Sequence, residues 1–273
     1  MKKILFPVLT AIVLFSACTR TDDSPGKLVI KVTDDPFNIS YIESATVKIS
    51  KVEIRKAGEH DSNKFLVLSE DTVTFDLLEL RNGITAGLLD LEVPSGSYDL
   101  MRLYVEEASL KIKGHADAFR LKIPGGHQSG IKIFIRPAIK VEGGLSSELL
   151  LDFDLSRSFV MRGNMHHAMG VTGFIFKPCI RAVDISTAGR IAGMVMDTSE
   201  VKINNAKVWI AQDTVISTAF TDTLGYYGFI GIPSGAYSMF ATKEGYDTVA
   251  IEEVKVYAGN KTIQNIVLEM NEE

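Results

Sequence analysis

Most of the chain alternates between apolar and polar residues with a period of two, which is typical of half-buried β-strands. Residues 27–33 show this alternation with β-branched side chains, and residues 45–55 continue it. In the second segment the alternation slips by one position between Ile49 and Val52, which predicts a β-bulge. Further segments of this kind are residues 100–105, 109–113, 119–123, 131–135 and 148–153. The pattern predicts an all-β protein.

Turn signals separate these segments at short intervals. Glycine or proline punctuates the chain at residues 35–36, 82–83, 94–96, 125–126 and 143–144. Short strands with frequent turns predict an antiparallel sandwich or barrel. No window sustains a helical period, and only residues 76–91 are assigned to a short helix or an irregular loop.

Two nearly identical peptides divide the chain into two units. Val-Pro-Ser-Gly-Ser-Tyr ends at Tyr98, and Ile-Pro-Ser-Gly-Ala-Tyr ends at Tyr237. Proline cannot donate to a strand ladder and glycine takes the turn, so each tyrosine is predicted to lock a corner by bonding backbone across its sandwich. With a boundary near residues 186–189, we expect tandem sandwiches at residues 27–186 and 188–273.

The N-terminus has the layout of a secretory signal. Lys2 and Lys3 precede an apolar stretch at residues 4–17, which is shorter than the roughly 20 residues of a membrane-spanning helix. The sequence Leu-Phe-Ser-Ala-Cys, ending at Cys18, resembles the lipobox of bacterial lipoproteins, although Phe15 departs from the usual small aliphatic residue. The resemblance implies a signal peptide at residues 1–17, an acylated Cys18 carrying palmitate-type chains, and a tether at 18–26. An ordinary signal peptide with an incidental cysteine is the alternative.

Charge narrows the choice of partners. The 273 residues include 29 basic and 34 acidic side chains, for a formal charge of −5. Cleavage before Cys18 removes two lysines and no acid, which makes it −7. An excess of acidic residues excludes nucleic acid as the expected partner. It also means that the acyl chains, and not the folded surface, are expected to hold the protein at the membrane. Asp22 and Asp23 resemble the surface-export signal of Bacteroidetes lipoproteins. We therefore expect a cell-envelope protein anchored at the outer membrane, with the leaflet left open.

The second unit carries several spaced motifs in a fixed order. Gly-Met-Val opens it at Gly193, Thr-Asp-Thr-Leu-Gly-Tyr-Tyr-Gly-Phe spans residues 221–229, and Gly-Tyr follows at 245–246. With Ile-Pro-Ser-Gly-Ala-Tyr between them, this order resembles the carboxypeptidase regulatory-like domain, which implies a prealbumin-like (transthyretin-like) sandwich. Independently of the resemblance, Asp222 and Gly225 suit a tight hairpin. Tyr227 and Phe229 alternate onto one face and are expected in the core.

The first unit also carries a motif set. Val-Thr-Asp-Asp-Pro lies at residues 32–36, Pro-Gly-Gly-His-Gln-Ser-Gly at 124–130, and Leu-Asp-Phe-Asp at 151–154. Together with Lys-Pro at 177–178 and Ile-Arg at 180–181, this order resembles the domain of unknown function 4382, found in bacterial lipoproteins and secreted proteins. The resemblance implies a location and a fold neighbourhood but no activity.

Four aspartates and one loop are the candidate functional groups. Asp34, Asp35, Asp152 and Asp154 form a carboxylate cluster if they meet in space, which would suit a hard cation or a glycosidase-type acid pair. The alternative, which we favour, is that Asp34 caps a turn while Asp152 and Asp154 lie on a solvated strand face or pair with Arg157, titrating independently. A glycine-rich loop places a second candidate ligand site at His127, Gln128 and Ser129.

The remaining reactive side chains predict no chemistry. His166 and His167 point to opposite faces if extended, and Cys179 in a strand-like run is expected to be an inert thiol. No phosphate loop, nucleophile elbow or zinc-protease motif is present, so we expect no cofactor, no metal and no catalysis. The leading hypothesis is a non-enzymatic envelope lipoprotein that binds or presents a glycan or a protein partner. The alternatives are a structural or adhesive, pilus-like component and a carboxylate-dependent hydrolase.

Overall fold

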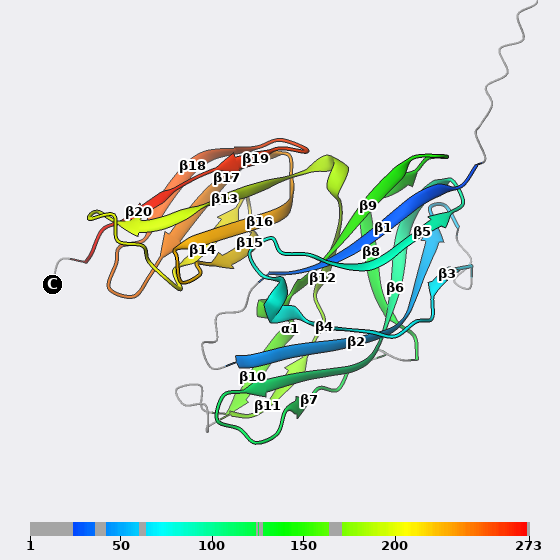
Figure 1. Cartoon of the computed structure of the whole chain (residues 1–273), viewed down its shortest axis with the longest axis horizontal. Coiled ribbons are helices and arrows are strands. Elements are labelled where there is room, and N and C mark those ends of the chain that lie inside the picture. The colour runs from blue at the N-terminus through cyan, green and yellow to red at the C-terminus, as the bar shows by residue number, and fades with distance from the viewer. Residues whose placement is uncertain are drawn as a thin grey trace, which may run out of the picture.

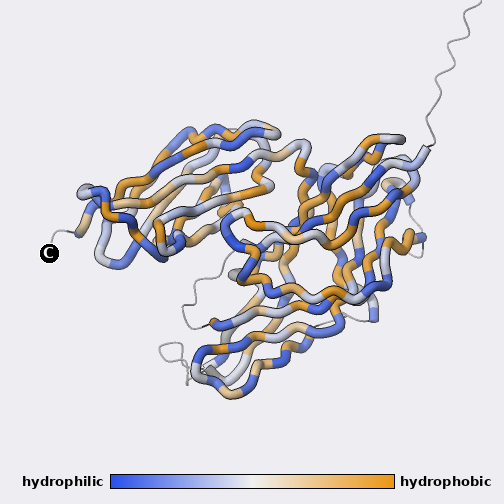
Figure 2. The backbone as a smooth tube through the Cα atoms, viewed as in Figure 1, coloured by the Kyte–Doolittle hydropathy of each residue, from blue (hydrophilic) through white to orange (hydrophobic). Residues whose placement is uncertain are grey.

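The computed structural model describes residues 24–35, 42–59, 64–123, 125, 128–163 and 171–271. Strands make up most of this part of the chain, which confirms the all-β prediction, and they form two lobes that lie side by side (Figure 1). None of the helices in these ranges is long and apolar enough to cross a membrane. Along the strands, hydrophobic and hydrophilic residues alternate (Figure 2).

One long sheet forms the body of the first domain. Its strands follow the order β3-β2-β6-β8-β12-β9-β1-β5, with β4 paired to β2 and β7 paired to β6, while β10 and β11 form a separate hairpin. The bounds are β1 (Gly26–Asp35), β2 (Ile42–Lys56), β3 (Leu66–Ser69), β4 (Val73–Asp76), β5 (Ala86–Val93), β6 (Gly96–Ile112), β7 (Phe119–Arg120), β8 (Ile131–Val141), β9 (Ser146–Asp154), β10 (Phe159–Gly163), β11 (Val171–Phe176) and β12 (Ile180–Asp184). The short helix α1 (Leu155–Ser158) follows β9.

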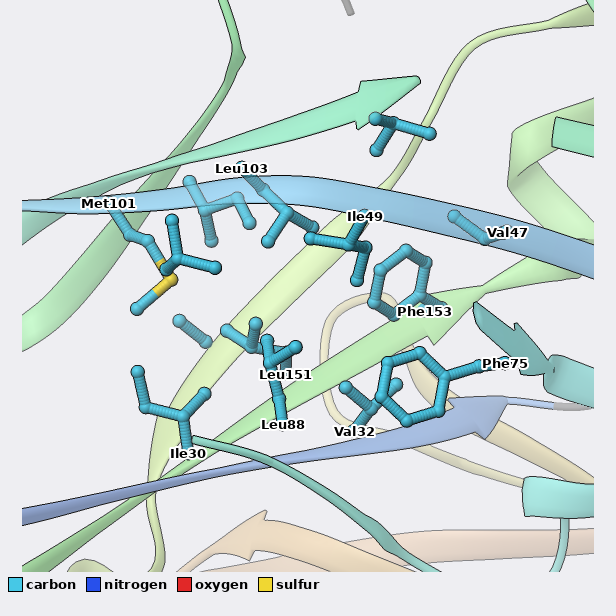
Figure 3. Packing of buried hydrophobic residues seen from close by; sticks show 14 of the residues in the cluster. Ile30, Val32, Val47, Ile49, Phe75, Leu88, Met101, Leu103, Leu151 and Phe153 are labelled. Carbon is cyan, nitrogen blue, oxygen red and sulfur yellow. The ribbon is translucent and has the colours of Figure 1, made fainter. Parts of the chain in front are cut away.

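The sheet curls over so that its two halves enclose the first core. Ile49 from β2 and Leu103 from β6 face Ile30, Leu151 and Phe153 from β1 and β9 across the interior (Figure 3). All five side chains are buried. The alternation of the sequence therefore places one set of side chains in the core and the other outside.

The predicted β-bulge in the second strand is confirmed. The pairing of β2 with β6 shifts register between Ile49 and Lys51, so that Val52 returns to the core face. The extra residue absorbs the slip in alternation and lets β2 and β6 run for 15 and 17 residues. The strands are therefore longer here than the frequent turn signals suggested.

The segment expected to be a short helix or an irregular loop is only partly so. A 3₁₀ helix covers Leu77–Leu80, but β5 then pairs with β1 as an edge strand. Leu89, Leu91 and Val93 of β5 face the core and alternate with the exposed Asp90 and Glu92, so this strand carries an alternation that the prediction for residues 76–91 overlooked. The sheet is also mixed, since β1 pairs with β9 and β8 with β12 in parallel.

The second domain is a sandwich of two sheets. Tyr227 and Phe229 pack in its core as predicted. Asp222 Oδ1 accepts the N–H groups of Leu224 and Tyr226, which confirms the hairpin. The sheets are β16-β13-β19 with β20, and β15-β14-β17-β18; their strands are β13 (Ala188–Asp197), β14 (Lys207–Ala211), β15 (Val215–Phe220), β16 (Tyr226–Pro233), β17 (Gly235–Thr242), β18 (Val249–Val256), β19 (Lys261–Ile263) and β20 (Ile266–Leu268).

Both repeated peptides form the same corner. The hydroxyl of Tyr98 donates to the carbonyl of Pro94 at 2.6 Å, and that of Tyr237 donates to the carbonyl of Pro233 at 2.7 Å. The tyrosine locks are therefore confirmed, but each bond closes on the backbone four residues upstream and does not cross the sandwich. The rings are buried, so each corner fixes the start of a strand, β6 or β17.

Removing either corner hydroxyl is expected to destabilise its domain. Tyr98→Phe and Tyr237→Phe each leave a proline carbonyl without its donor and should lower the free energy of unfolding by about 1 kcal/mol. Tyr226→Phe is the matched control, because that ring is 47% exposed. Chemical denaturation measures all three variants. Wild-type stability in Tyr237→Phe would contradict the role of that corner.

The two domains meet in a small apolar cluster. Leu150 on β9 and Val183 on β12 pack with Ala188 and Ile230 of the second domain. Gly231 has a φ of +71°, and a Cβ there would lie 2.9 Å from the Leu150 side chain. The backbone of β16 therefore approaches β9 closely, and the domains form a continuous contact.

Candidate functional site

Strand β9 is buried on both faces, and this positions the aspartates. Leu149, Leu151 and Phe153 enter the core of the first domain. Leu150 and Asp152 alternate with them onto the opposite face, which the second domain covers. Asp152 is therefore buried at the domain interface, and the prediction that it lies on a solvated face is wrong.

Arg181 joins Asp152 to the second domain. Its Nη2 lies 2.6 Å from a carboxylate oxygen of Asp152, the residue directly opposite it on the neighbouring strand. Its Nη1 donates to the carbonyl of Gly231 at 2.9 Å. The acid is 7% exposed and the arginine 27%, so this ion pair is largely withdrawn from water. One guanidinium thus bridges the two domains.

The environment of Asp152 shifts its acidity. Burial raises the pKa of the Asp152 carboxyl, the positive charge of Arg181 opposes that rise, and the nearby Asp154 adds to it. The charge of Asp154 therefore acts on the pKa of Asp152, and the prediction that Asp152 titrates independently is wrong. The positive charge of Arg181 offsets part of the free-energy cost of burying the Asp152 carboxylate.

Asp154 has a local structural role. Its Oδ1 accepts the backbone N–H of Arg157 at 2.8 Å and so caps α1, and its Oδ2 pairs with the Arg157 side chain. The predicted pairing with Arg157 is confirmed for Asp154 only. Asp152 pairs with Arg181 instead, because antiparallel pairing of β9 and β12 places those two residues side by side.

Asp34 meets Asp152 at a cavity too small for a substrate. The β1–β9 pairing sets Thr33 beside Asp152 and Asp34 beside Phe153, and Asp34 is 4% exposed. Asp34 and Asp152 line a cavity of about 10 Å³ that Ser217 of the second domain helps to close. This volume is at the lower limit for one water molecule. Two of the four candidate aspartates therefore line one cavity, but the cleft that a hydrolase would need is not at this place.

The other predicted site residues are dispersed or undescribed. Gln128 and Ser129 lie in an exposed turn in which the Ser129 N–H donates to the Gly125 carbonyl. His127, His166, His167 and Cys18, like the side chain of Asp35, lie outside the described residues. Cys179 is half-buried, and its N–H donates to Ser158 Oγ. Among the residues that the structure describes, no group of three histidines, cysteines or acids could hold a metal.

A larger hollow lies elsewhere along the domain interface. It consists of two adjoining spaces of about 600 and 280 Å³, both lined by Arg81, Asn82 and Asp222. We call it the interdomain groove. One wall is the 3₁₀ helix Leu77–Leu80 and its following turn, and the other is the hairpin before β16. Its remaining lining residues are Leu78, Glu79, Ile84, Asn204, Asn205, Phe220, Thr221, Thr223, Tyr226 and Tyr227.

Asn82 fixes the turn that forms the first wall. It adopts a φ of +57°, which asparagine tolerates better than most residues. Its Nδ2 donates to the Phe220 carbonyl at 3.1 Å, and its backbone lies against Gly228, where a Cβ would be 2.8 Å from the Asn82 carbonyl oxygen. The buried Oδ1 of Asn82 accepts no hydrogen bond from the described residues. The groove therefore holds an unused buried acceptor.

The groove combines charged side chains that lack an ion-pair partner with an exposed ring, although Asp222 Oδ1 accepts two backbone N–H groups and Arg81 Nε donates to the Leu78 carbonyl. Within the described part of the chain, Glu79, Arg81 and Asp222 form no ion pair. Tyr226 is 47% exposed and Ile84 57% exposed. Of its thirteen lining residues, eight are polar or charged and five are apolar or aromatic. A hollow of this volume at a domain interface is a common place for a ligand site.

Sequence reasoning missed the groove because its walls are far apart along the chain. Arg81 and Tyr226 are 145 positions apart in the sequence, and nothing in the alternation links them. One signal was present: the Asn82-Gly83 turn lies within residues 76–91, the segment that was predicted to be a short helix or an irregular loop. Such irregular segments often carry binding residues.

Comparisons with protein families agree with the two motif sets. The family model described as "Domain of unknown function (DUF4382)" matches residues 25–178, which is more than half of the chain. The chain belongs to this family. The carboxypeptidase regulatory-like domain matches residues 190–269, so the predicted order of the two units is confirmed. No curated protein matches the chain.

Several solved structures align over much of the chain with low scores. The Bacillus anthracis TIE protein is 14% identical with a TM-score of 0.26; the alignment covers 90% of this chain and only 34% of that protein. The minor pilin GBS52 of Streptococcus agalactiae is 10% identical, with 91% and 97% of the two chains covered and a TM-score of 0.26. The shaft pilin SpaA of Lactobacillus rhamnosus GG is 10% identical, with 92% and 99% covered and a TM-score of 0.26.

Proposed function

We propose that this protein is a non-enzymatic binding protein, held in the cell envelope at the outer membrane by lipid on Cys18, and that a glycan binds in the interdomain groove. The observation that carries the proposal is the division of polar groups between the two interface sites. At the small cavity lined by Asp34 and Asp152, the carboxylate of Asp152 forms an ion pair with Arg181. Glu79, Arg81 and Asp222 face the open groove without such partners in the described chain.

The chemistry of the groove suits a saccharide. Sugar rings present apolar C–H faces and a rim of hydroxyls, so they need a flat apolar surface beside donors and acceptors. Tyr226 offers a ring with a polar tip. Arg81 supplies N–H donors, and the Asn82 Oδ1 and Asp222 supply acceptors for sugar hydroxyls. Carboxylates and a guanidinium together favour a neutral or weakly charged glycan over a polyanion.

The edges of the first sheet weigh against the pilus-like alternative. Self-association by strand pairing needs a long, uncharged edge. In the described sheet one end is β3, with four residues, and the other is β5, which presents exposed Asp90 and Glu92. Short or charged edges resist pairing between copies, so binding in the groove accounts better for this surface.

Truncation of the exposed ring in the groove is expected to weaken glycan binding. Tyr226→Ala should lower the affinity of any glycan selected on a glycan array by about tenfold, because it removes the stacking surface. Arg81→Ala should weaken the same glycan by removing its donors. Isothermal titration calorimetry measures both. The matched control is Tyr257→Ala, a 58% exposed tyrosine outside the groove.

Two results would count against this assignment. A glycan that binds Tyr226→Ala as tightly as the wild type would place the site elsewhere. Release of reducing ends or of a leaving group from any bound glycan would show turnover and return the hydrolase hypothesis to consideration.

A further inference from the structure

Several strand ends meet at the end of the first domain where the described chain begins. Pairing sets Gly26 beside Val93, Gly96 beside Val141, and Ile54 beside Leu66. The starts of β1, β3 and β6 and the ends of β2, β5 and β8 therefore share one end, which we call the tether end. In Figure 1 the start of β1 lies at the side of the first domain away from the second.

The chain is firmly fixed at this end. The Gly144 N–H donates to the Pro25 carbonyl at 3.0 Å, and the Lys27 N–H donates to the Leu145 carbonyl at 2.8 Å. A Cβ at Gly26 would lie 2.2 Å from the Glu142 carbonyl oxygen, so the first strand is pressed against the β8–β9 turn. The point where the tether joins the domain is thus rigid and lies beside Leu145.

The tether end exposes apolar surface. Leu145 is 57% exposed at the tip of the β8–β9 turn, and Leu66 is 39% exposed. Leu66 also borders a pocket of about 330 Å³ whose apolar walls include Ile54, Pro94 and Tyr98. Single exposed leucines are ordinary on soluble proteins. Here an exposed leucine at the turn tip and a pocket that combines apolar residues with Lys56, Glu59 and Lys64 lie at the same end of the domain.

The lysines near this end are largely neutralised. Lys27 pairs with Asp90 at 3.0 Å, Lys140 with Glu142, and Lys64 with Glu59 at 3.2 Å. Lys56 beside the pocket forms no ion pair within the described residues and donates to the Ser95 carbonyl. Attraction to anionic headgroups through free lysines is therefore weak here. Any contact of this end with a membrane depends on its apolar side chains.

We propose that the tether end rests on the bilayer that holds the lipid of Cys18, with Leu145 and Leu66 at the boundary between headgroups and acyl chains. This inference rests on the proposed lipid anchor. Seven residues lie between Cys18 and Gly26, so eight Cα–Cα steps span at most about 29 Å when fully extended. The domain end joined to so short a tether is the end that meets the membrane.

The same geometry directs the groove away from the membrane. Strand β1 runs for 10 residues, or roughly 30 Å, from the tether end towards the interdomain contacts. Thr33 and Asp34 near its far end reach the cavity beside the second domain. The glycan site therefore opens well above the bilayer, where a large saccharide has room.

A tryptophan placed at Leu145 tests the membrane contact. The full-length lipidated protein carries Trp209→Phe, which removes its one tryptophan, together with Leu145→Trp or Leu66→Trp. It is reconstituted into phosphatidylcholine vesicles with or without brominated acyl chains. Bromolipid should quench either new tryptophan by about half, because bromines near the headgroup boundary lie at its depth. Leu224→Trp is the control, since Leu224 is 59% exposed beside the groove and should not be quenched.

Flotation of the vesicles separates the two proposals. If the protein floats with the vesicles but bromolipid quenches neither Leu145→Trp nor Leu66→Trp, the proposed bilayer contact of the tether end is wrong and the lipid anchor is still supported. Equal quenching of Leu224→Trp would also overturn it, since the domain would then lie flat or tumble freely. Protein that does not float would remove the lipid anchor and this inference with it.

Discussion

Replacing Arg181 with methionine is expected to lower the free energy of unfolding by about 3 kcal/mol, the usual cost of leaving one buried charge without its partner. Asp152 is 7% exposed and loses its guanidinium, while Gly231 loses the donor to its carbonyl. Urea denaturation monitored by circular dichroism measures the loss. Arg120→Met is the matched control: Arg120 and its partner Glu107 are 85% and 46% exposed, so their pair should contribute less than about 1 kcal/mol.

The pH dependence of the Arg181→Met variant identifies the cause. Burial already raises the pKa of Asp152, and removal of Arg181 takes away the charge that opposes the rise. A carboxyl whose pKa is higher in the folded state binds its proton more tightly there, so protonation stabilises the fold at acid pH. That stabilisation is lost as the pH rises through the folded-state pKa, starting above about pH 4, the ordinary value for aspartate.

The variant should therefore be closest to wild type in acid and furthest from it at neutral pH. The double variant Asp152→Asn with Arg181→Met removes the buried charge and should recover most of the lost stability at neutral pH. A loss in Arg181→Met that is constant with pH and not recovered by Asp152→Asn would mean that packing, not charge, explains the effect.

The sequence predicted the strands best where alternation and turn chemistry are local. The bulge at Ile49, the corners at Tyr98 and Tyr237 and the hairpin at Asp222 each depend on residues within a few positions of one another. These features follow from backbone rules that act over short distances. The motifs that resemble the two families are also short peptides, so their order along the sequence was enough to identify both family resemblances.

The burial of Asp152 could not be predicted from alternation alone. Its strand includes Leu149, Leu150 and Leu151 in succession, and such a run is typical of a strand covered on both faces. What covers the outer face is the second domain, whose contacts with β9 lie about 80 residues further along the chain at Gly231. The groove has the same origin, since Arg81 and Tyr226 come together only when the domains pack.

A rigid contact between the domains has a functional consequence. The groove takes one wall from each domain, so its shape depends on their relative position. Arg181, Asn82 and the Leu150 cluster fix that position with an ion pair, a hydrogen bond and apolar packing. A binding site preformed in this way loses less conformational freedom when a ligand enters.

Truncation of Leu150 is expected to uncouple the two domains. Leu150 is fully buried in the interdomain cluster, and Leu150→Ala should lower the free energy of unfolding by about 3 kcal/mol by leaving a cavity between β9 and β16. Trp209, the one tryptophan of the chain, lies on β14 and reports on the second domain alone. Far-UV circular dichroism reports on both domains. In the wild type the two signals should change together, and in Leu150→Ala they should separate.

The neighbouring residue supplies the control. Leu149 is equally buried, but its side chain enters the core of the first domain on the other face of β9. Leu149→Ala should cost a similar free energy while the two signals stay coincident, because the interface is intact and the domains still unfold as one unit. Coincident transitions in Leu150→Ala would mean that the Arg181 bridge and Asn82 are enough to couple the domains. Separate transitions already in the wild type would mean that the contact does not couple them, and the groove would then have to form when its ligand binds.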